Sequence, residues 1–195
     1  MHIGCGVECK ICQVAKQRRA QHKPIPESDA IYAKKMYEKT SFDHLEIDKH
    51  KLCEGVGGVK YALCSKDEAS DFAHFYPDTK KDGLAVATGL RDHFGADLRL
   101  AGKFYADGAQ TFAKVARILR VPERNSTPYT PTSNARHERW MGTLGDGIRG
   151  LLYSSGLSLA WWPFAGKYYC LAHNLLKVNK RSGKTPYDMR YPNNK

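Results

Sequence analysis

The order of strand-like and helix-like segments after residue 40 most constrains what this chain can fold into. Short alternating apolar runs predict strands, and longer runs with apolar residues three or four apart predict helices. The predicted strands are 44–48, 59–65, 71–76 and 103–106, and the predicted helices are 79–94, 110–119, 134–154 and 158–178. Three strands, a helix, a strand and further helices indicate an α/β fold with a mixed sheet flanked by helices.

The chain divides into a leader, a core and a tail. Its 195 residues can bury one good core and a small extra segment. We expect residues 1–40 to be a truncated, basic, cysteine-bearing leader, because Pro24 and Pro26 indicate a linker near its end. Residues 41–180 are the predicted core, and residues 181–195 form a predicted basic and turn-rich tail.

The charge of the chain favours a polyanionic partner. Lys and Arg number 31 against 20 Asp and Glu, a formal net charge of +11, and each phosphate that a protein neutralises releases counterions. Basic residues gather in two runs, which predict phosphate contacts or a nuclear-localisation-like patch, with a solvated surface as the alternative. These runs are Lys10, Lys16, Arg18, Arg19 and Lys23, and then Lys177, Lys180, Arg181 and Lys184. We therefore expect nucleic acid as the partner and the nucleus as the site of action.

Two other locations are not expected. Residues 1–15 have no apolar central run, so they do not form a secretory signal, and the scattered cysteines favour a reducing compartment. No run approaches the roughly 20 apolar residues that cross a bilayer. We predict a soluble protein that is not secreted and has no membrane partner.

Three carboxylates stand where chemistry commonly occurs in an α/β fold. Asp48 ends the first predicted strand, Asp107 ends a later strand and is followed by Gly108, and Glu138 lies in the first turns of a helix. Carboxylates at the ends of elements can converge, and three of them can hold two Mg²⁺ or Mn²⁺ ions about 4 Å apart. Alternatives for the middle position are Asp82, Asp92 and Asp97.

The most specific motif runs through the third predicted helix. The loop 126–134 reads Ser-Thr-Pro-Tyr-Thr-Pro-Thr-Ser-Asn and leads into a helix that carries Glu138-Arg139. This motif resembles the integrase catalytic core of copia-type retrotransposons, within the RNase H-like superfamily. Residues 42–48 and 104–108 resemble the two strands that carry the aspartates of that family. Residues 161–163 and 185–188 resemble its downstream segments, so the resemblance covers roughly residues 40–191.

The resemblance implies an RNase H-like fold and a metal-dependent polynucleotidyl transferase. Asp48, Asp107 and Glu138 would be both its catalytic residues and its ligands for Mg²⁺ or Mn²⁺. The implied reactions are 3′-end processing and DNA strand transfer, which integrate a retroelement. The implied partners are the element ends, a target duplex and further copies of the chain. The residues predicted to contact nucleic acid are Asn134, Arg136, His137, Arg139 and Arg149.

The leader carries half of a zinc site. Cys9 and Cys12 have the spacing of a C-x-x-C knuckle, and a zinc module precedes the core in the family that the chain resembles. Cys5 and His22 could complete four ligands for Zn²⁺. The alternative is a leader that binds no metal.

Departures from the family keep other functions open. Ala135 stands where the family has Gly, and Gly142 and Gly145 stand where relatives often carry basic residues. A catalytically decayed nucleic-acid-binding module is therefore the alternative, and a nuclease acting on RNA in a hybrid is a third hypothesis. Four aromatic residues of the last predicted helix favour core or dimer surface over base stacking. They are Trp161, Trp162, Tyr168 and Tyr169.

Overall fold

Four strands form one mixed sheet in the part of the chain that the structure, a computed structural model, describes. This part comprises residues 33–46, 53–105, 114–115, 117–120, 131–180 and 182–193. The strands are β1 (Lys39–Glu46), β2 (Tyr61–Asp67), β3 (Ala73–Asp78) and β4 (Lys103–Tyr105). Their order is β3-β2-β1-β4. β2 is antiparallel to both neighbours, and β4 is parallel to β1. The predicted mixed sheet is confirmed.

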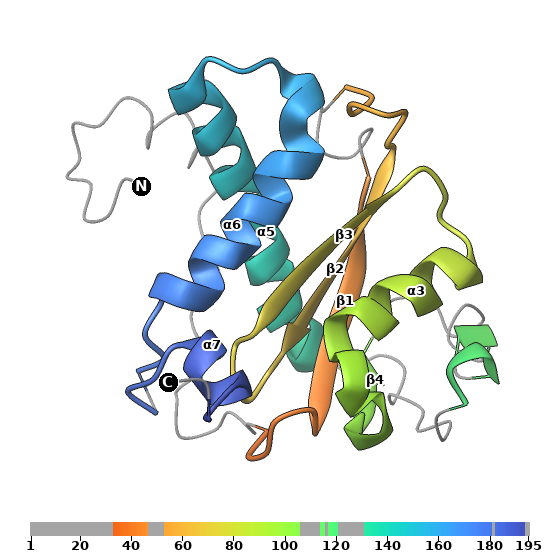
Figure 1. Ribbon diagram of the computed structural model, residues 1–195, viewed down its shortest axis with the longest axis vertical. Coiled ribbons are helices and arrows are strands. Elements are labelled where there is room, and N and C mark those ends of the chain that lie inside the picture. Colours follow the sequence, from red (N-terminus) through yellow and green to blue (C-terminus); the bar gives the residue numbers. More distant parts are fainter. Residues whose placement is uncertain are drawn as a thin grey trace.

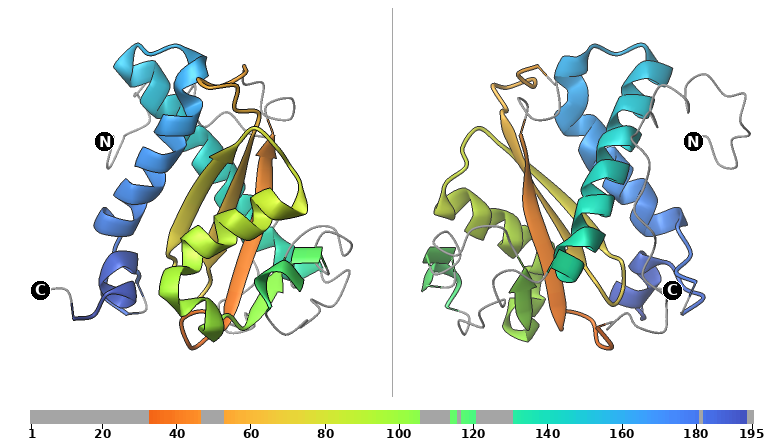
Figure 2. Two further views of the ribbon diagram at one scale, coloured as in Figure 1. Left: turned by 45° about the vertical axis from the view of Figure 1, so that its right-hand side comes forward. Right: turned by 180° about the vertical axis from the view of Figure 1, so that it is seen from behind.

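Helices cover both faces of the sheet (Figures 1 and 2). The helical segments are α3 (Gly83–Phe94), η2 (Gly95–Leu100), α5 (Pro131–Ser155), η3 (Leu159–Trp161), α6 (Trp162–Leu176) and α7 (Pro186–Arg190). α3 packs on one face, and α5 and α6 pack side by side on the other. Helix α5 confirms the predicted helix 134–154, whereas the predicted helix 158–178 is divided into η3 and α6.

Three predictions of secondary structure need a correction or stay incomplete. The first strand begins at Lys39, five residues before the predicted start. The tail 181–195, predicted as turns, contains helix α7, in which the Thr185 hydroxyl accepts a hydrogen bond from the Asp188 amide in a capping box. Of the predicted helix 110–119, only residues 114–115 and 117–119 are described, and these are helical.

The core has two halves, one on each face of the sheet. Leu45 of β1 belongs to the half under α5 and α6, together with Leu144 and Trp162. Phe42 of β1 belongs to the half under α3, together with Leu90. Neighbouring residues of a strand point to opposite faces of the sheet. A sheet that helices cover on both faces therefore needs apolar side chains on each face. No helix in the described residues is long and apolar enough to cross a bilayer.

An amide clamp fixes the C-terminal half of α6 to the sheet. Asn174 is buried, its Oδ1 accepts a hydrogen bond from the Ala73 amide at 2.9 Å, and its Nδ2 donates to the Ala73 carbonyl at 2.8 Å. About two turns earlier, Gly166 lies so close to Phe75 that an added Cβ would be 2.4 Å from the ring. Small size at Gly166 and paired hydrogen bonds at Asn174 therefore set the distance between α6 and β3.

Candidate active site

Two of the three predicted carboxylates lie outside the described residues. These are Asp48 and Asp107, so their convergence with Glu138 stays a prediction. Glu138 lies on α5 and is exposed. Within the described part of the chain, no hydrogen bond or ion pair joins the Glu138 carboxylate to another residue. An exposed carboxylate of this kind can accept a ligand without first losing a protein partner.

His137 fixes the position of Glu138 against the sheet. The His137 Nδ1 and the Ser41 Oγ lie 2.9 Å apart, and only 4% of His137 is exposed. Ser41 belongs to β1. It lies two residues after Lys39, which pairs with Lys103 where β1 and β4 first meet. Glu138, the next residue along α5, therefore lies beside the N-terminal half of β1.

The register of β4 leads its chain toward the same place. β4 runs parallel to β1, and its last residue, Tyr105, is opposite Ser41. Asp107 follows Tyr105 by two residues, which span at most about 7 Å. Asp48 follows Glu46 by two residues, and Glu46 is five residues from Ser41, roughly 16 Å along the strand. For Asp48 to meet Glu138, the chain after Glu46 would have to turn back along β1.

Asp43 is a carboxylate that the sequence reasoning missed. It is an exposed residue inside β1, two positions from Ser41. Alternate residues of a strand share a face, so Asp43 lies on the face that α5 covers, as do Ser41 and Leu45. The sequence signal for Asp43 was its position between Phe42 and Leu45, in the alternating run that forms β1. Of the carboxylates in β1, Asp43 lies nearest to the contact between His137 and Ser41.

The three alternatives for the middle position have structural roles instead. Asp82 caps α3 and accepts hydrogen bonds from two backbone amides of its first turn. Asp92 of α3 pairs with His74, with Nε2 and Oδ2 3.0 Å apart, and Asp97 accepts a hydrogen bond from the Tyr37 hydroxyl at 3.1 Å. All three lie on the α3 side of the sheet, the face opposite Glu138, so the structure gives no support to these alternatives.

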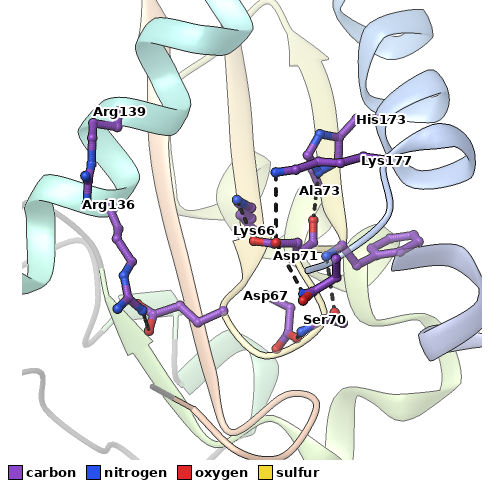
Figure 3. Close-up of polar contacts among 12 residues, drawn as sticks. Lys66, Asp67, Ser70, Asp71, Ala73, Arg136, Arg139, His173 and Lys177 are labelled. Carbon is purple, nitrogen blue, oxygen red and sulfur yellow. Dashed lines mark hydrogen bonds and ion pairs between the residues drawn. The ribbon is translucent and has the colours of Figure 1, made fainter. Parts of the chain in front are cut away.

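Two of the arginines predicted to bind nucleic acid are held by acidic residues. Arg136 lies 3.6 Å from Glu68, whose carboxylate is also 2.6 Å from the Lys39 ammonium. Arg149 lies 2.5 Å from Asp146, three residues earlier on α5. Figure 3 shows Arg136 on α5, apart from the group formed by Lys66, Asp71 and Lys177. Both guanidinium groups are therefore partly neutralised within the chain.

The remaining predicted contacts differ in their access to a ligand. Arg139 is exposed on α5, and the side chain of Asn134 lies outside the described residues. His137 is buried, and burial with the nearby Lys66 charge lowers its pKa to about 4. A neutral ring that faces Ser41 cannot contact a phosphate at the surface. The burial of His137 against Ser41 therefore gives no support to its predicted contact with DNA.

A charged group joins the C-terminal end of α6 to the turn between β2 and β3 (Figure 3). The Asp71 carboxylate lies 2.8 Å from the Lys66 ammonium and 3.9 Å from that of Lys177. Burial alone would raise the pKa of Asp71, but the charges of Lys66 and Lys177 outweigh it and hold that pKa below its usual value. The His173 Nε2 lies 3.0 Å from the Asp71 carbonyl oxygen. This group fixes the helix to the sheet.

No metal-binding cluster of His, Cys, Asp or Glu occurs among the described residues. The predicted zinc ligands Cys9 and Cys12, with Cys5 and His22, lie outside them. Cys170 is buried in the core, and burial raises the pKa of its thiol to about 12. A thiol that stays protonated is a poor metal ligand, so Cys170 is a core residue.

Comparisons with known proteins support the fold. A chain of the simian T-cell lymphotropic virus intasome in complex with PP2A regulatory subunit B56 gamma is similar to this chain, with a TM-score of 0.62 and 16% identity over 92% of this chain and 63% of that one. The catalytic core domain of BIV integrase is similar with a TM-score of 0.53 and 13% identity, over 78% of this chain and 93% of that one. This chain thus spans less than two thirds of the intasome chain. No family model and no curated protein matches the sequence. The predicted α/β fold of an integrase catalytic core is confirmed.

Proposed function

We propose that this protein is an integrase-type polynucleotidyl transferase that processes the 3′ ends of a copia-type retroelement and joins them to a target DNA. The observation that carries the proposal is the position of Glu138. Its helix lies on an integrase-core sheet, and the contact between His137 and Ser41 holds it beside the strand that β4 joins in parallel. Asp107 follows β4 by two residues, so Asp107 and Glu138 can contribute to one site.

The proposed catalytic carboxylates are Asp107 and Glu138, with a third from β1 or the segment after it. The resemblance to copia-type integrases favours Asp48, and the register of β1 favours Asp43. Carboxylate oxygens suit Mg²⁺ or Mn²⁺. Two such ions, held by these residues, would activate the attacking oxygen and stabilise the leaving oxygen of a phosphodiester. The protein itself would position the DNA ends and supply charge to the backbone phosphates.

The proposed partners are the element ends, the target duplex and further copies of the chain, with the nucleus as the place of action. Arg139 is the proposed phosphate contact on α5, because it is exposed and adjoins Glu138. Zn²⁺ at Cys9 and Cys12 remains part of the proposal for the leader. In both solved structures named above the likeness is to an integrase or intasome chain, which agrees with DNA as the partner.

The test is a Mg²⁺-dependent joining assay with a labelled DNA duplex and a supercoiled target. Glu138→Gln and Asp107→Asn should each abolish joining and leave DNA binding unchanged. Comparing Asp43→Asn with Asp48→Asn identifies the third carboxylate, because only the true ligand should lose activity. Asp92→Asn is the matched control, since Asp92 lies on the other face of the sheet. Full joining by Glu138→Gln would refute the proposal.

A second function is favoured by the surface of α5. Gly142 and Gly145 supply no charge one and two turns after Glu138, and acidic residues partly neutralise Arg136 and Arg149. A decayed core that binds DNA without cutting it would show this pattern. It predicts salt-sensitive binding and no metal-dependent joining by the unmodified protein. Cutting of RNA in a hybrid, but not of duplex DNA, would instead favour the nuclease hypothesis.

A further inference from the structure

Three buried polar atoms gather where helix α7 meets the sheet, and none of them has a hydrogen-bond partner among the described residues. They are Nη1 of Arg190 on α7, Nδ1 of His74 on β3 and Nε2 of His93 near the end of α3. Such atoms are rare in folded proteins, because each one carries the cost of its own desolvation. Three of them in one place therefore indicate a bound group.

Ring contacts place the three side chains together. The ring centroids of His74 and His93 are 5.9 Å apart. The Phe72 ring lies 5.9 Å from the His93 ring and 4.3 Å from the guanidinium carbon of Arg190. The Arg190 Nη2 also lies 3.9 Å from the position of a Cβ added at Gly95, the residue that follows α3. Helix α7 thus brings its arginine to the C-terminal end of α3, beside both histidines.

Hydrogen bonds fix the orientation of both histidine rings. His93 is fully buried, and its Nδ1 lies 3.0 Å from the Ser65 hydroxyl oxygen on β2. The His74 Nε2 lies 3.0 Å from a carboxylate oxygen of Asp92. Each ring has therefore used one nitrogen to hold its place in the protein and offers the other nitrogen to a ligand.

Arg190 determines the charge of that ligand. A guanidinium keeps its proton when it is buried, and no ion pair joins Arg190 to a carboxylate in the part of the chain that the structure describes. Its Nε donates to the Tyr191 hydroxyl at 3.0 Å, and the Phe72 ring attracts its charge. Neither contact gives Nη1 an acceptor. Because buried charges in proteins are normally paired, Nη1 favours an anion.

We propose that Arg190, His74 and His93 bind a small inorganic anion, chloride or phosphate, that fastens helix α7 to the sheet and to the end of α3. Arg190 supplies the charge, and each histidine adds a hydrogen bond when its second nitrogen carries a proton. Arg190 is half-buried and the His74 side chain is 22% exposed, so solvent reaches the site. The proposal uses no residue of the proposed catalytic site and is independent of it.

Anion binding and proton uptake should be coupled at this site. Burial is the main cause that lowers the pKa of His74 and of His93, and the charge of Arg190 adds to it. An anion beside the rings would stabilise their charged forms and raise both pKa values, so binding should strengthen as the pH falls from 8 to 6. The other charged or titratable groups near the three side chains lie on the surrounding elements: Tyr37, Asp92, Asp97, Lys167 and Tyr191.

Thermal unfolding of the full chain in matched salts tests the site without DNA or metal. Compared with sodium gluconate of equal ionic strength, chloride or phosphate should raise the melting temperature at pH 6 by at least roughly 3 °C. The two salts, used separately, distinguish the two anions. The rise should be smaller at pH 8, and His74→Gln should reduce this dependence on pH.

Two arginine variants separate a bound anion from a general effect of salt. Arg190→Gln should lose the rise in melting temperature, whereas Arg99→Gln, the matched control at an exposed residue of η2, should keep it. Equal melting temperatures in all salts would overturn the proposal, as would a rise that Arg190→Gln retains or that the control loses. If Arg190→Gln does not fold, His74→Gln decides, because a full rise in that variant at pH 6 would also overturn it.

Bromide locates the anion directly, because its anomalous scattering identifies it in a crystal. Crystals of the full chain that are soaked in bromide should show an anomalous peak beside Nη1 of Arg190 and between the two histidine rings. A water molecule at that position without bromide, or an acidic side chain of the same chain, would satisfy the three atoms in another way and would overturn the proposal.

Discussion

Buried histidines make the stability of the protein depend on pH, and burial lowers the pKa of the fully buried His93 well below 6.5. His137 is 4% and His173 is 7% exposed, and burial lowers the pKa of each from 6.5 to about 4. The unfolded chain therefore binds protons at a higher pH than the folded chain does. Below about pH 6.5 protonation favours the unfolded state, and the loss of stability is complete near pH 4. Each histidine contributes on the order of 3 kcal/mol at most.

We predict that the free energy of unfolding falls steadily between pH 7 and pH 4.5, as measured by urea denaturation. His137→Asn should remove a part of that fall, because the amide does not titrate, whereas His93 and His173 still take up protons on unfolding. Lys180→Ala, a change at an exposed side chain, is the control and should leave the fall intact. An unfolding free energy that is constant over this range would contradict the burial of these rings.

At the scale of elements, two glycines of α5 have opposite roles. A Cβ added to Gly147 would lie 2.1 Å from the ring of Tyr169 on α6, whereas a Cβ at Gly150 would meet no atom within 4 Å. Gly147→Ala should therefore separate α5 from α6 and destabilise the protein by about 1–3 kcal/mol. Gly150→Ala should stabilise it by up to about 1 kcal/mol through helix propensity.

Thermal unfolding of the two glycine variants checks this difference in one helix. Because both substitutions are the same, a common effect on the unfolded chain cancels in the comparison. Equal shifts of the melting temperature, in either direction, would mean that α5 and α6 do not pack as closely as the structure places them.

Elements with local signals were predictable from the sequence, and those that depend on distant partners were not. The apolar stripe predicted for α5 comprised Met141, Leu144, Ile148, Leu151 and Leu152, of which all but the half-buried Leu151 are buried. The boundaries of β1 were wrong because pairing with β2 and β4 extends a strand beyond its own alternation. α7 was missed although Thr185 and Asp188 form a capping box that the sequence displays.

At the scale of the whole molecule, the net charge of +11 predicts DNA binding that weakens as salt rises. Arg139→Ala should weaken binding by roughly 1 kcal/mol on any sequence and reduce the salt slope by about one. Arg136→Ala and Arg149→Ala should have small effects, because Glu68 and Asp146 already neutralise part of their charge. Fluorescence anisotropy over a series of salt concentrations measures all three, and an Arg139 variant that binds as the parent does would remove α5 from the interface.

The chemistry of the candidate site stays a prediction, and its geometry could not be predicted from the sequence. Carboxylates at the ends of elements pointed to metal-dependent phosphoryl chemistry, and Glu138 is exposed as that role requires. Which aspartates lie near Glu138 depends on the register between β1 and β4. This register pairs residues that are 64 positions apart in the chain, such as Lys39 and Lys103. Local patterns carry no information on such a register, so Asp43 was not considered. For the same reason we predicted that His137 lies at the surface, because its partner, Ser41, is 96 residues away in the chain.

The amide clamp between Asn174 and Ala73 also bears on how the chain reaches this fold and leaves it. It joins residues 101 positions apart, whereas β1, β2 and β3 pair with their neighbours in the chain. Closing so long a loop costs chain entropy before the contact returns any energy, so we expect the clamp to form late in folding. Contacts that form that late govern the lifetime of the native state rather than the speed of folding. We therefore expect Asn174→Ala to speed unfolding, measured by stopped-flow, more than it slows folding.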